Sequence, residues 1–288
     1  MFLHYHWGQV VRLFFFIQFI FVLSLSLPSH SLSHHIIHTF FFAVDDSIFQ
    51  VGEDLIYNVS YASIDIGQVR VKLVDKVTRD NRIYYKAMAY IDSYKGLPFV
   101  NVHSVYENTM PETIYSTWFK ARTKIKDRWI AFEYNYDYPH HALYIDESVW
   151  ETGTIVKRDT LVTDTLYQDG LSLFYFARQQ VRTRQKIRTP SIISEKKGDT
   201  FINFMVERTK EEIDAVDYPI DVLHFEGEAG WVGVFGLTGH FEGWFSNDAA
   251  RVPILAKMKV LIGNIRIELM KWTRQGWSPP RYVEQKSK

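Results

Sequence analysis

The chain has 288 residues, of which 47% are apolar and 23% charged, and its 33 basic residues are balanced by 33 acidic ones. This composition is that of a globular protein, and the absence of an excess positive charge gives no support for nucleic-acid binding. There is no cysteine, which excludes disulfides, thiolate nucleophiles, cysteine-ligated metals and a lipid anchor on an N-terminal cysteine. Aromatic residues make up 16% of the chain and favour β-structure.

An export signal is predicted at the N-terminus. Arg12 is followed by an apolar run from Leu13 to Leu27 and then by Pro28 and a Ser/His-rich stretch. A bilayer span needs roughly 20 apolar residues, so this shorter run fits a cleaved signal peptide better. We expect a signal and leader over residues 1–44, cleaved at about 31–43, and one β-rich domain over residues 45–288. A retained signal anchor and a buried helix are the alternatives.

The first part of the predicted domain alternates between apolar and polar residues, which is typical of strands with one buried face. The alternating positions are Leu55, Tyr57, Val59 and Tyr61, then Val69, Val71 and Leu73, then Ile83, Tyr85, Ala87, Ala89 and Ile91. The turn formers Thr78 to Asn81 predict a hairpin between the last two groups. Trp118 to Lys126 and Ala131 to Tyr138 are interpreted as a further strand pair.

A helix is predicted from Asp169 to Val181, with Asp169 as its N-cap. It is short and is expected to cover the sheet. Lys196 to Asp199 is predicted to be the turn between strands Ile192 to Ser194 and Phe201 to Arg208. Gly263-Asn264 is predicted to be the turn between Ala256 to Ile262 and Ile265 to Lys271.

Glycine recurs between Gly227 and Gly243, at positions 227, 230, 233, 236, 239 and 243. The spacing matches neither a P-loop nor a dinucleotide-binding fingerprint. We interpret these glycines as bends, bulges and close backbone approaches in strands, with an anion-binding loop as the alternative.

Three blocks of the sequence resemble the family named domain of unknown function 3108. They are Phe49 to Tyr61 with Gly67, then Asp169 to Arg178, and finally Trp244 to Ile254 followed by Val260 to Gly263. The resemblance implies an exported bacterial β-rich domain located in the periplasm or outside the cell, and it implies no reaction. With the strand pattern, it predicts an all-β, mainly antiparallel fold: a strongly curved sheet or open barrel or sandwich with one short covering helix.

The side chains with reactive or hydrogen-bonding groups lie closest together in the sequence at Trp244, Ser246, Asp248 and Arg251. An ion pair between Asp248 and Arg251 that pins a loop is the favoured interpretation, and ligand binding is the alternative. Glu53 is interpreted as the partner of a basic side chain at a strand start. His140 and His141 follow Asp137 and could offer metal ligands, but adjacent strand residues point to opposite faces, so a solvated turn is expected.

No catalytic motif is found, and no catalytic residue, metal or cofactor is predicted. We expect an exported binding or structural module without catalytic activity, with no membrane span after signal cleavage, whose partner is an apolar, lipid-like ligand or an envelope protein. Two alternatives stay open: a hydrolase acting on a cell-envelope polymer, and a scaffold that pairs its strand edges with a protein in envelope assembly.

Overall fold

The computed structural model describes residues 46–97, 100–232, 238–259 and 264–284. All of these belong to the unit that runs from Ala43 to Lys288. The predicted signal and leader, as well as Gly233, Gly236, Gly263 and the strand end at 260–262, lie outside the described residues.

The described unit consists almost entirely of strands. In chain order the elements are η2 (Asp46–Ile48), β1 (Asp54–Tyr61), β2 (Ile64–Arg79), β3 (Arg82–Ser93), β4 (His103–Pro111), β5 (Trp118–Ile125), β6 (Arg128–Asp137), η3 (Tyr138–His140), β7 (Ala142–Val149), β8 (Thr154–Val162), α1 (Gly170–Gln180), β9 (Lys186–Ile193), β10 (Lys196–Glu211), β11 (Ile220–Ala229), β12 (Gly239–Ser246), β13 (Pro253–Lys259) and β14 (Asn264–Thr273).

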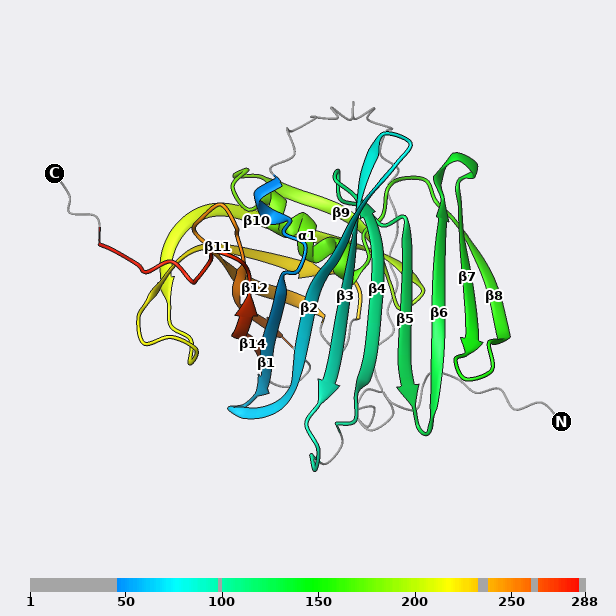
Figure 1. The fold of residues 1–288 in the computed structure, drawn as a ribbon, viewed down its shortest axis with the longest axis horizontal. Helices are drawn as coiled ribbons and strands as arrows, with labels where there is room; N and C mark the ends of the chain where they lie inside the picture. The colour runs from blue at the N-terminus through cyan, green and yellow to red at the C-terminus, as the bar shows by residue number, and fades with distance from the viewer. Residues whose placement is uncertain (1–45, 98–99, 233–237, 260–263, 285–288) are drawn as a thin grey trace, which may run out of the picture. The chain divides into compact units, whose positions relative to one another are not determined.

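These strands form one 14-stranded antiparallel sheet that is open, with β8 and β9 as its two edges (Figure 1). Strands that are consecutive in sequence are neighbours in the sheet, except β8 and β9. The first and last strands pair with each other, with Tyr57 of β1 opposite Leu269 of β14, and β8 is followed by α1 before the chain enters β9. The predicted all-β, mainly antiparallel class with an open sheet and one short helix is confirmed.

The predicted alternation in the first strands is confirmed by their burial. Leu55, Tyr57 and Val59 of β1 are buried, as are Tyr85 and Ala87 of β3, whereas the residues between them are partly exposed. Successive side chains of a strand point to opposite faces, so one face of β1 to β3 is directed into the main apolar core.

The hairpin predicted around Thr78 to Asn81 is confirmed, because Asp80 and Asn81 connect β2 to β3 with φ angles of 49° and 58°. Two successive positive φ angles belong to the turn type that matches the twist of antiparallel strands.

The turn predicted at Lys196 to Asp199 is wrong. The turn residues are Ser194 and Glu195, with φ angles of 51° and 61°, and β10 begins at Lys196. Gly198 has another role, since a Cβ atom there would lie 3.0 Å from the carbonyl oxygen of Gly230. The glycine therefore allows a close backbone approach within the sheet. In the sequence alone, a glycine at this position looks like a turn residue.

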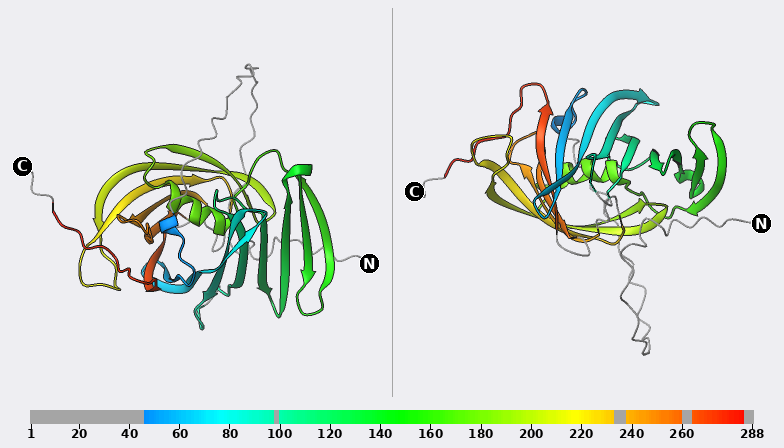
Figure 2. Two further views of the ribbon diagram at one scale, coloured as in Figure 1. Left: turned by 45° about the horizontal axis from the view of Figure 1, so that its top comes forward. Right: turned by 90° about the horizontal axis from the view of Figure 1, so that it is seen from below.

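Helix α1 lies in the hollow of the curved sheet (Figure 2). Its N-cap is Asp169, as predicted, and the Asp169 side chain accepts hydrogen bonds from the backbone amides of Leu171 and Ser172. Leu171 and Tyr175 pack into the main core, while Ala177 packs into a second apolar cluster formed with β10, β11 and β12. The helix thus packs its side chains against part of the concave side of the sheet.

The glycine-rich region confirms the interpretation of close approaches at two positions. A Cβ atom at Gly227 would lie 2.3 Å from the ring of Phe241, and one at Gly243 would lie 2.5 Å from the ring of Phe225. Aromatic rings therefore occupy the space that a side chain at either glycine would need. Among the described residues, no helix has the length and apolar character needed to cross a membrane.

Candidate functional site

A buried ionic cluster joins the start of β1, helix α1 and the chain after β14. Glu53 and Arg178 are 1% and 0% exposed, and the guanidinium of Arg178 donates to both carboxylate oxygens of Glu53, at 2.6 and 3.1 Å. Arg274 donates to the same carboxylate. Although burial by itself lowers the pKa of Arg178, the charge of Glu53 and its hydrogen bonds raise that pKa above its ordinary value. The prediction that Glu53 pairs with a basic side chain is confirmed.

Arg178 also ties the helix to the loop between β12 and β13. Its guanidinium donates to the carbonyl oxygens of Ala250, at 2.9 Å, and Arg251, at 3.2 Å. All of these acceptors are buried, so the arginine is held at four points without contact to solvent. A buried guanidinium with four of its five N–H groups bonded to the protein is positioned to hold the fold together rather than to bind a ligand.

Three of the four residues singled out in the sequence lie together in that loop. The carboxylate of Asp248 accepts hydrogen bonds from the hydroxyl of Ser246 at 2.9 Å, the backbone amide of Arg251 at 3.0 Å and the indole of Trp277 at 2.7 Å. The Ser246 hydroxyl also accepts from the amide of Val252 at 2.8 Å. All of these hydrogen bonds are made between groups of the protein, so they hold the loop in one conformation.

The guanidinium of Arg251 donates to the carbonyl oxygen of Gln179 at 3.3 Å, near the end of α1. Arg251 therefore donates to Asp248 through its backbone amide, while the side chain of Arg251 donates to the helix. Trp244 lies apart from this loop network, with its ring stacked on His224 at 5.0 Å and with the ammonium of Lys257 4.6 Å from the ring centroid.

The histidines at the β6–β7 connection lie in an exposed turn, as predicted. Asp137 caps η3 and its carboxylate lies 2.8 Å from Nδ1 of His140, whereas Nδ1 of His141 lies 3.1 Å from the carbonyl oxygen of Thr163. The two imidazoles thus face different partners. Within the described ranges, no group of three His, Cys, Asp or Glu side chains is arranged to hold a metal ion.

The acidic and histidine side chains that a hydrolase could use for acid–base chemistry, Glu53, Asp137, His140 and Asp248, do not lie together. Glu53 is enclosed by two arginines and Asp248 is occupied by three donors, while Asp137 and His140 are at the exposed turn. General acid–base chemistry needs such groups within reach of one substrate atom. The arrangement of these particular residues therefore lends no support to the hydrolase alternative.

The concave side of the sheet is packed with aromatic rings of the protein itself. Phe49 stacks on Tyr85 with ring centroids 3.9 Å apart, and its other neighbour is Tyr175 of α1 at 5.6 Å. Asp169, at the start of the helix, also accepts a hydrogen bond from Asn108 of β4 and so fastens the helix to the sheet. Burial raises the pKa of the Asp169 carboxyl against the effect of its donors.

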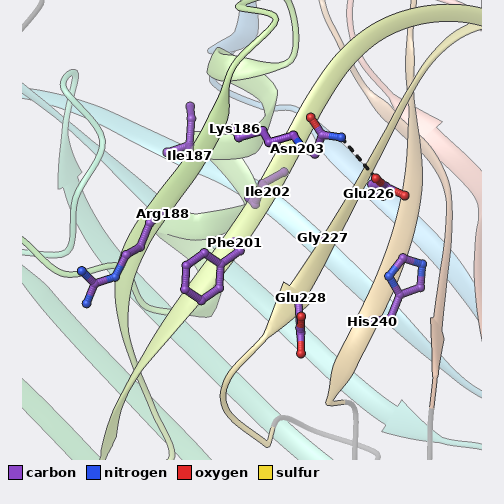
Figure 3. A pocket seen from close by; sticks show the side chains of 10 residues that line it. All are labelled: Lys186, Ile187, Arg188, Phe201, Ile202, Asn203, Glu226, Gly227, Glu228 and His240. Carbon is purple, nitrogen blue, oxygen red and sulfur yellow. Dashed lines mark hydrogen bonds between the residues drawn. The ribbon is translucent and has the colours of Figure 1, made fainter. Parts of the chain in front are cut away.

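An open pocket of 470 Å³ lies over strands β9 to β12 (Figure 3). Four of its ten lining residues are charged, and Asn203 of β10 donates a hydrogen bond to Glu226 of the neighbouring strand β11 at 3.1 Å. It is lined by Lys186, Ile187, Arg188, Phe201, Ile202, Asn203, Glu226, Gly227, Glu228 and His240. Sites for apolar ligands are enclosed mainly by apolar and aromatic side chains, which this pocket is not.

The edge strand β8, at the far right of Figure 1, is exposed on both faces. Val156 and Val162 are 55% and 67% exposed. The amide of Thr163 donates to the carbonyl oxygen of His141, the residue before β7, at 2.8 Å. Because donors alternate along an antiparallel strand, Arg158, Thr160 and Val162 direct their backbone groups away from β7. Accordingly the amide of Thr160 donates to the side chain of Asp159, at 2.8 Å, rather than to a strand.

The opposite edge, β9, is protected. The amide of Gln168 donates to the carbonyl oxygen of Pro190 at 2.9 Å, and the amide of Ile192 donates to the carbonyl oxygen of Gln168 at 2.8 Å. Pro190 itself has no amide hydrogen to offer. Proline and a covering segment are two of the devices that keep a sheet edge from pairing with another chain. Within the part of the chain that the structure describes, the two edges of this sheet therefore differ, since a proline and a covering segment occur at β9 and not at β8.

Sequence reasoning did not identify β8. A strand exposed on both faces has no alternation of apolar and polar residues, so the pattern that revealed β1 to β3 is absent. The signal that could have found it is its richness in β-branched residues, with Thr154, Ile155, Val156, Thr160 and Val162 directly after Gly153.

The fold and its interior define an open, β-barrel-like protein curved around one helix. The profile of the family described as "Protein of unknown function (DUF3108)" matches residues 56–270, and the chain belongs to this family. No curated protein sequence matches the chain.

Two solved structures match the chain. One is a crystal structure of a β-barrel-like protein of domain of unknown function DUF1849 from Brucella abortus, with a TM-score of 0.50 and 10% identity, covering 78% of this chain and 98% of that chain. The other is a protein with a YmcC-like fold from Bacteroides fragilis, with a TM-score of 0.34 and 6% identity, covering 78% of this chain and 97% of that chain. At these identities, the first similarity concerns the fold alone.

Proposed function

We propose that this protein is an exported, non-catalytic binding module that holds a protein partner by pairing one strand of that partner with the free edge of β8. The observation that carries the proposal is the difference between the two sheet edges. β9 is covered by Gln168 and contains Pro190, whereas β8 presents the backbone groups of Arg158, Thr160 and Val162 outward. Strand addition to an open edge is a common mode of peptide recognition.

The chemistry of β8 supports a protein strand rather than a small molecule as the occupant. Outward N–H and C=O groups offer main-chain hydrogen bonds, and the exposed aliphatic side chains of Ile155, Val156 and Val162 offer apolar contact beside them. A peptide in an extended conformation can form the main-chain hydrogen bonds and the apolar contacts together. Among the described residues, the side chains of α1 and the first strands pack together on the concave side, and four charged residues line the open pocket, so neither place favours an apolar ligand.

Export is the part of the proposal that rests on the sequence, because the apolar run from Leu13 to Leu27 has the length of a signal peptide. Sequencing the N-terminus of the protein purified from its own cells checks this part. A start between residues 31 and 44 is expected, and a start before Leu13 contradicts export by cleavage.

Proline at position 160 tests the edge directly. The amide of Thr160 points away from β7, so Thr160→Pro removes an outward donor and leaves the β7–β8 ladder intact, while Thr160→Ala keeps the donor. A photo-crosslinking residue at Val162 is introduced in both backgrounds and irradiated in intact cells. A defined crosslinked peptide that is present with Thr160→Ala and lost with Thr160→Pro is expected, at equal thermal stability of both variants. A crosslink unaffected by the proline, or none in either background, contradicts partner binding at β8.

A further inference from the structure

The side chains along β8 are arranged so that the strand is complementary to itself. Lys157 and Asp159 point to the same face, with the ammonium and carboxylate 3.5 Å apart, and Arg158 lies between them on the other face. Two copies of an antiparallel strand related by a twofold axis place residues opposite each other whose numbers have a constant sum. Only the residue on the axis then faces its own copy.

When the axis passes Arg158, Lys157 of each copy lies opposite Asp159 of the other. This register forms two cross-strand ion pairs, and it brings the outward backbone groups of the two Arg158 residues together as a hydrogen-bonded pair. Shifting the axis to Asp159 would place two carboxylates opposite each other, and shifting it to Thr160 would place Asp159 opposite Leu161. The charge pattern therefore selects the first register.

The one like-charge contact in this register has a compensating partner in the structure. The two Arg158 side chains would face each other, but each lies 3.5 Å from a carboxylate oxygen of Asp146 in its own chain. Asp146 lies directly opposite Arg158 on β7 of the same chain. The Arg158–Asp146 ion pair is therefore present in each copy and reduces the repulsion between the two Arg158 side chains.

We infer that the partner of β8 is a second copy of this chain, paired antiparallel about Arg158 so that the two 14-stranded sheets become one continuous sheet. The inference rests on the proposed function, which it makes specific. The free chain holds the amide of Thr160 on the Asp159 carboxylate, and pairing transfers that amide to a carbonyl of the second copy and Asp159 to Lys157 of that copy.

Two charge reversals test the register. Lys157→Asp faces Asp159 of an identical copy, and Asp159→Lys faces Lys157, so each variant alone has two repulsive pairs in place of two attractive ones. Mixing the two variants restores both pairs in a heterodimer. The carboxylate introduced at position 157 then meets the ammonium introduced at position 159, and the unchanged Asp159 of one chain meets the unchanged Lys157 of the other. Sedimentation equilibrium on the protein as purified from its own cells measures the dimer dissociation constant.

For the wild type a concentration-dependent dimer is expected, with each single variant at least about tenfold weaker and the equimolar mixture within about threefold of the wild type. Matching thermal stability of the single variants shows that they are folded. Single variants that dimerise as the wild type does, or a mixture that stays monomeric, overturn the inference. If the wild type is monomeric while the Thr160-dependent crosslink joins β8 to a different protein, this inference fails and the proposed function stands. If neither dimer nor crosslink is found, both fail.

Discussion

Arg178 and Glu53 form a two-point ion pair with no solvent contact, although 125 residues separate them in the sequence. The pair connects the last turn of α1 to Glu53, the residue just before β1. With Arg274 on the other side of the carboxylate, it fixes the helix against β1 and β14, the two neighbouring strands that join the halves of the sheet. Each of the three blocks named in the family resemblance contributes to this cluster or to the adjacent loop, with Glu53 from the first block, Arg178 from the second and Asp248 from the third.

Replacing Arg178 by methionine leaves Glu53 buried with half of its partners. We expect Arg178→Met to lower the free energy of unfolding by about 3 to 5 kcal/mol, the cost of breaking a buried ion pair from one side. Urea denaturation followed by tryptophan fluorescence measures this. Arg188→Met is the control, because Arg188 pairs with Asp199 at the surface, and no measurable loss is expected there. Equal effects of the two substitutions would contradict the structural importance of the buried pair.

The N-cap carboxyl of Asp169 should make stability depend on pH. Because burial raises its folded pKa above the ordinary value of 3.8, the folded state binds this proton more tightly than the unfolded chain. The contribution is fully present below pH 3.8 and is lost as the pH rises through the folded pKa. The free energy of unfolding of the wild type minus that of Asp169→Asn should therefore fall as the pH rises above 3.8. Urea titrations of both proteins at a series of pH values measure the difference, and a flat or rising curve contradicts the direction of the shift.

Gly227 should not tolerate a methyl group. A Cβ atom there would overlap the ring of Phe241, so Gly227→Ala is expected to cost about 1 to 3 kcal/mol of stability. Gly170, at the start of α1, is the matched control, since no heavy atom lies within 4 Å of its added Cβ. Gly170→Ala should change stability by less than about 0.5 kcal/mol. Thermal and urea denaturation of both variants check this, and adding Phe241→Leu should recover part of the loss at Gly227.

Asp248 is expected to act on stability. Asp248→Ala leaves the Ser246 hydroxyl, the Arg251 amide and the Trp277 indole without their acceptor, which should cost about 1 to 3 kcal/mol. A double-mutant cycle with Trp277→Phe measures the coupling between the carboxylate and the indole. A coupling of zero, together with unchanged stability of Asp248→Ala, would return this loop to the candidates for ligand binding.

Much of the fold could be predicted from local sequence patterns. The alternation in β1 and β3 gave their buried faces, the paired turn formers Asp80 and Asn81 gave a hairpin, and Asp169 gave the start of α1. Each of these depends on residues close together in sequence, which is why the sequence was informative. The turn at Ser194 and Glu195 was missed because neither residue is a strong turn former, while Gly198 nearby imitated one.

The remaining features depend on contacts between distant segments. Nothing in the residues around Glu53 names Arg178 or Arg274 as its partners, and the pairing of β1 with β14 follows from the arrangement of the whole sheet. The candidate site has the same character: that β8 is an edge, and that Gln168 covers β9, are properties of the strand order.

The pairing of β1 with β14 also has a consequence for how the chain folds. Until residues 264–273 have been synthesised, β1 has a neighbour on one side only, and the strands before α1 and those after it can form two separate meanders with mainly local contacts. Joining them requires contact across roughly two hundred residues, which is entropically slow. The last step of folding is therefore expected to be the docking of two preformed halves, and a circular permutant that begins at β9 and ends at β8, with β14 linked to β1, should bypass it and fold faster.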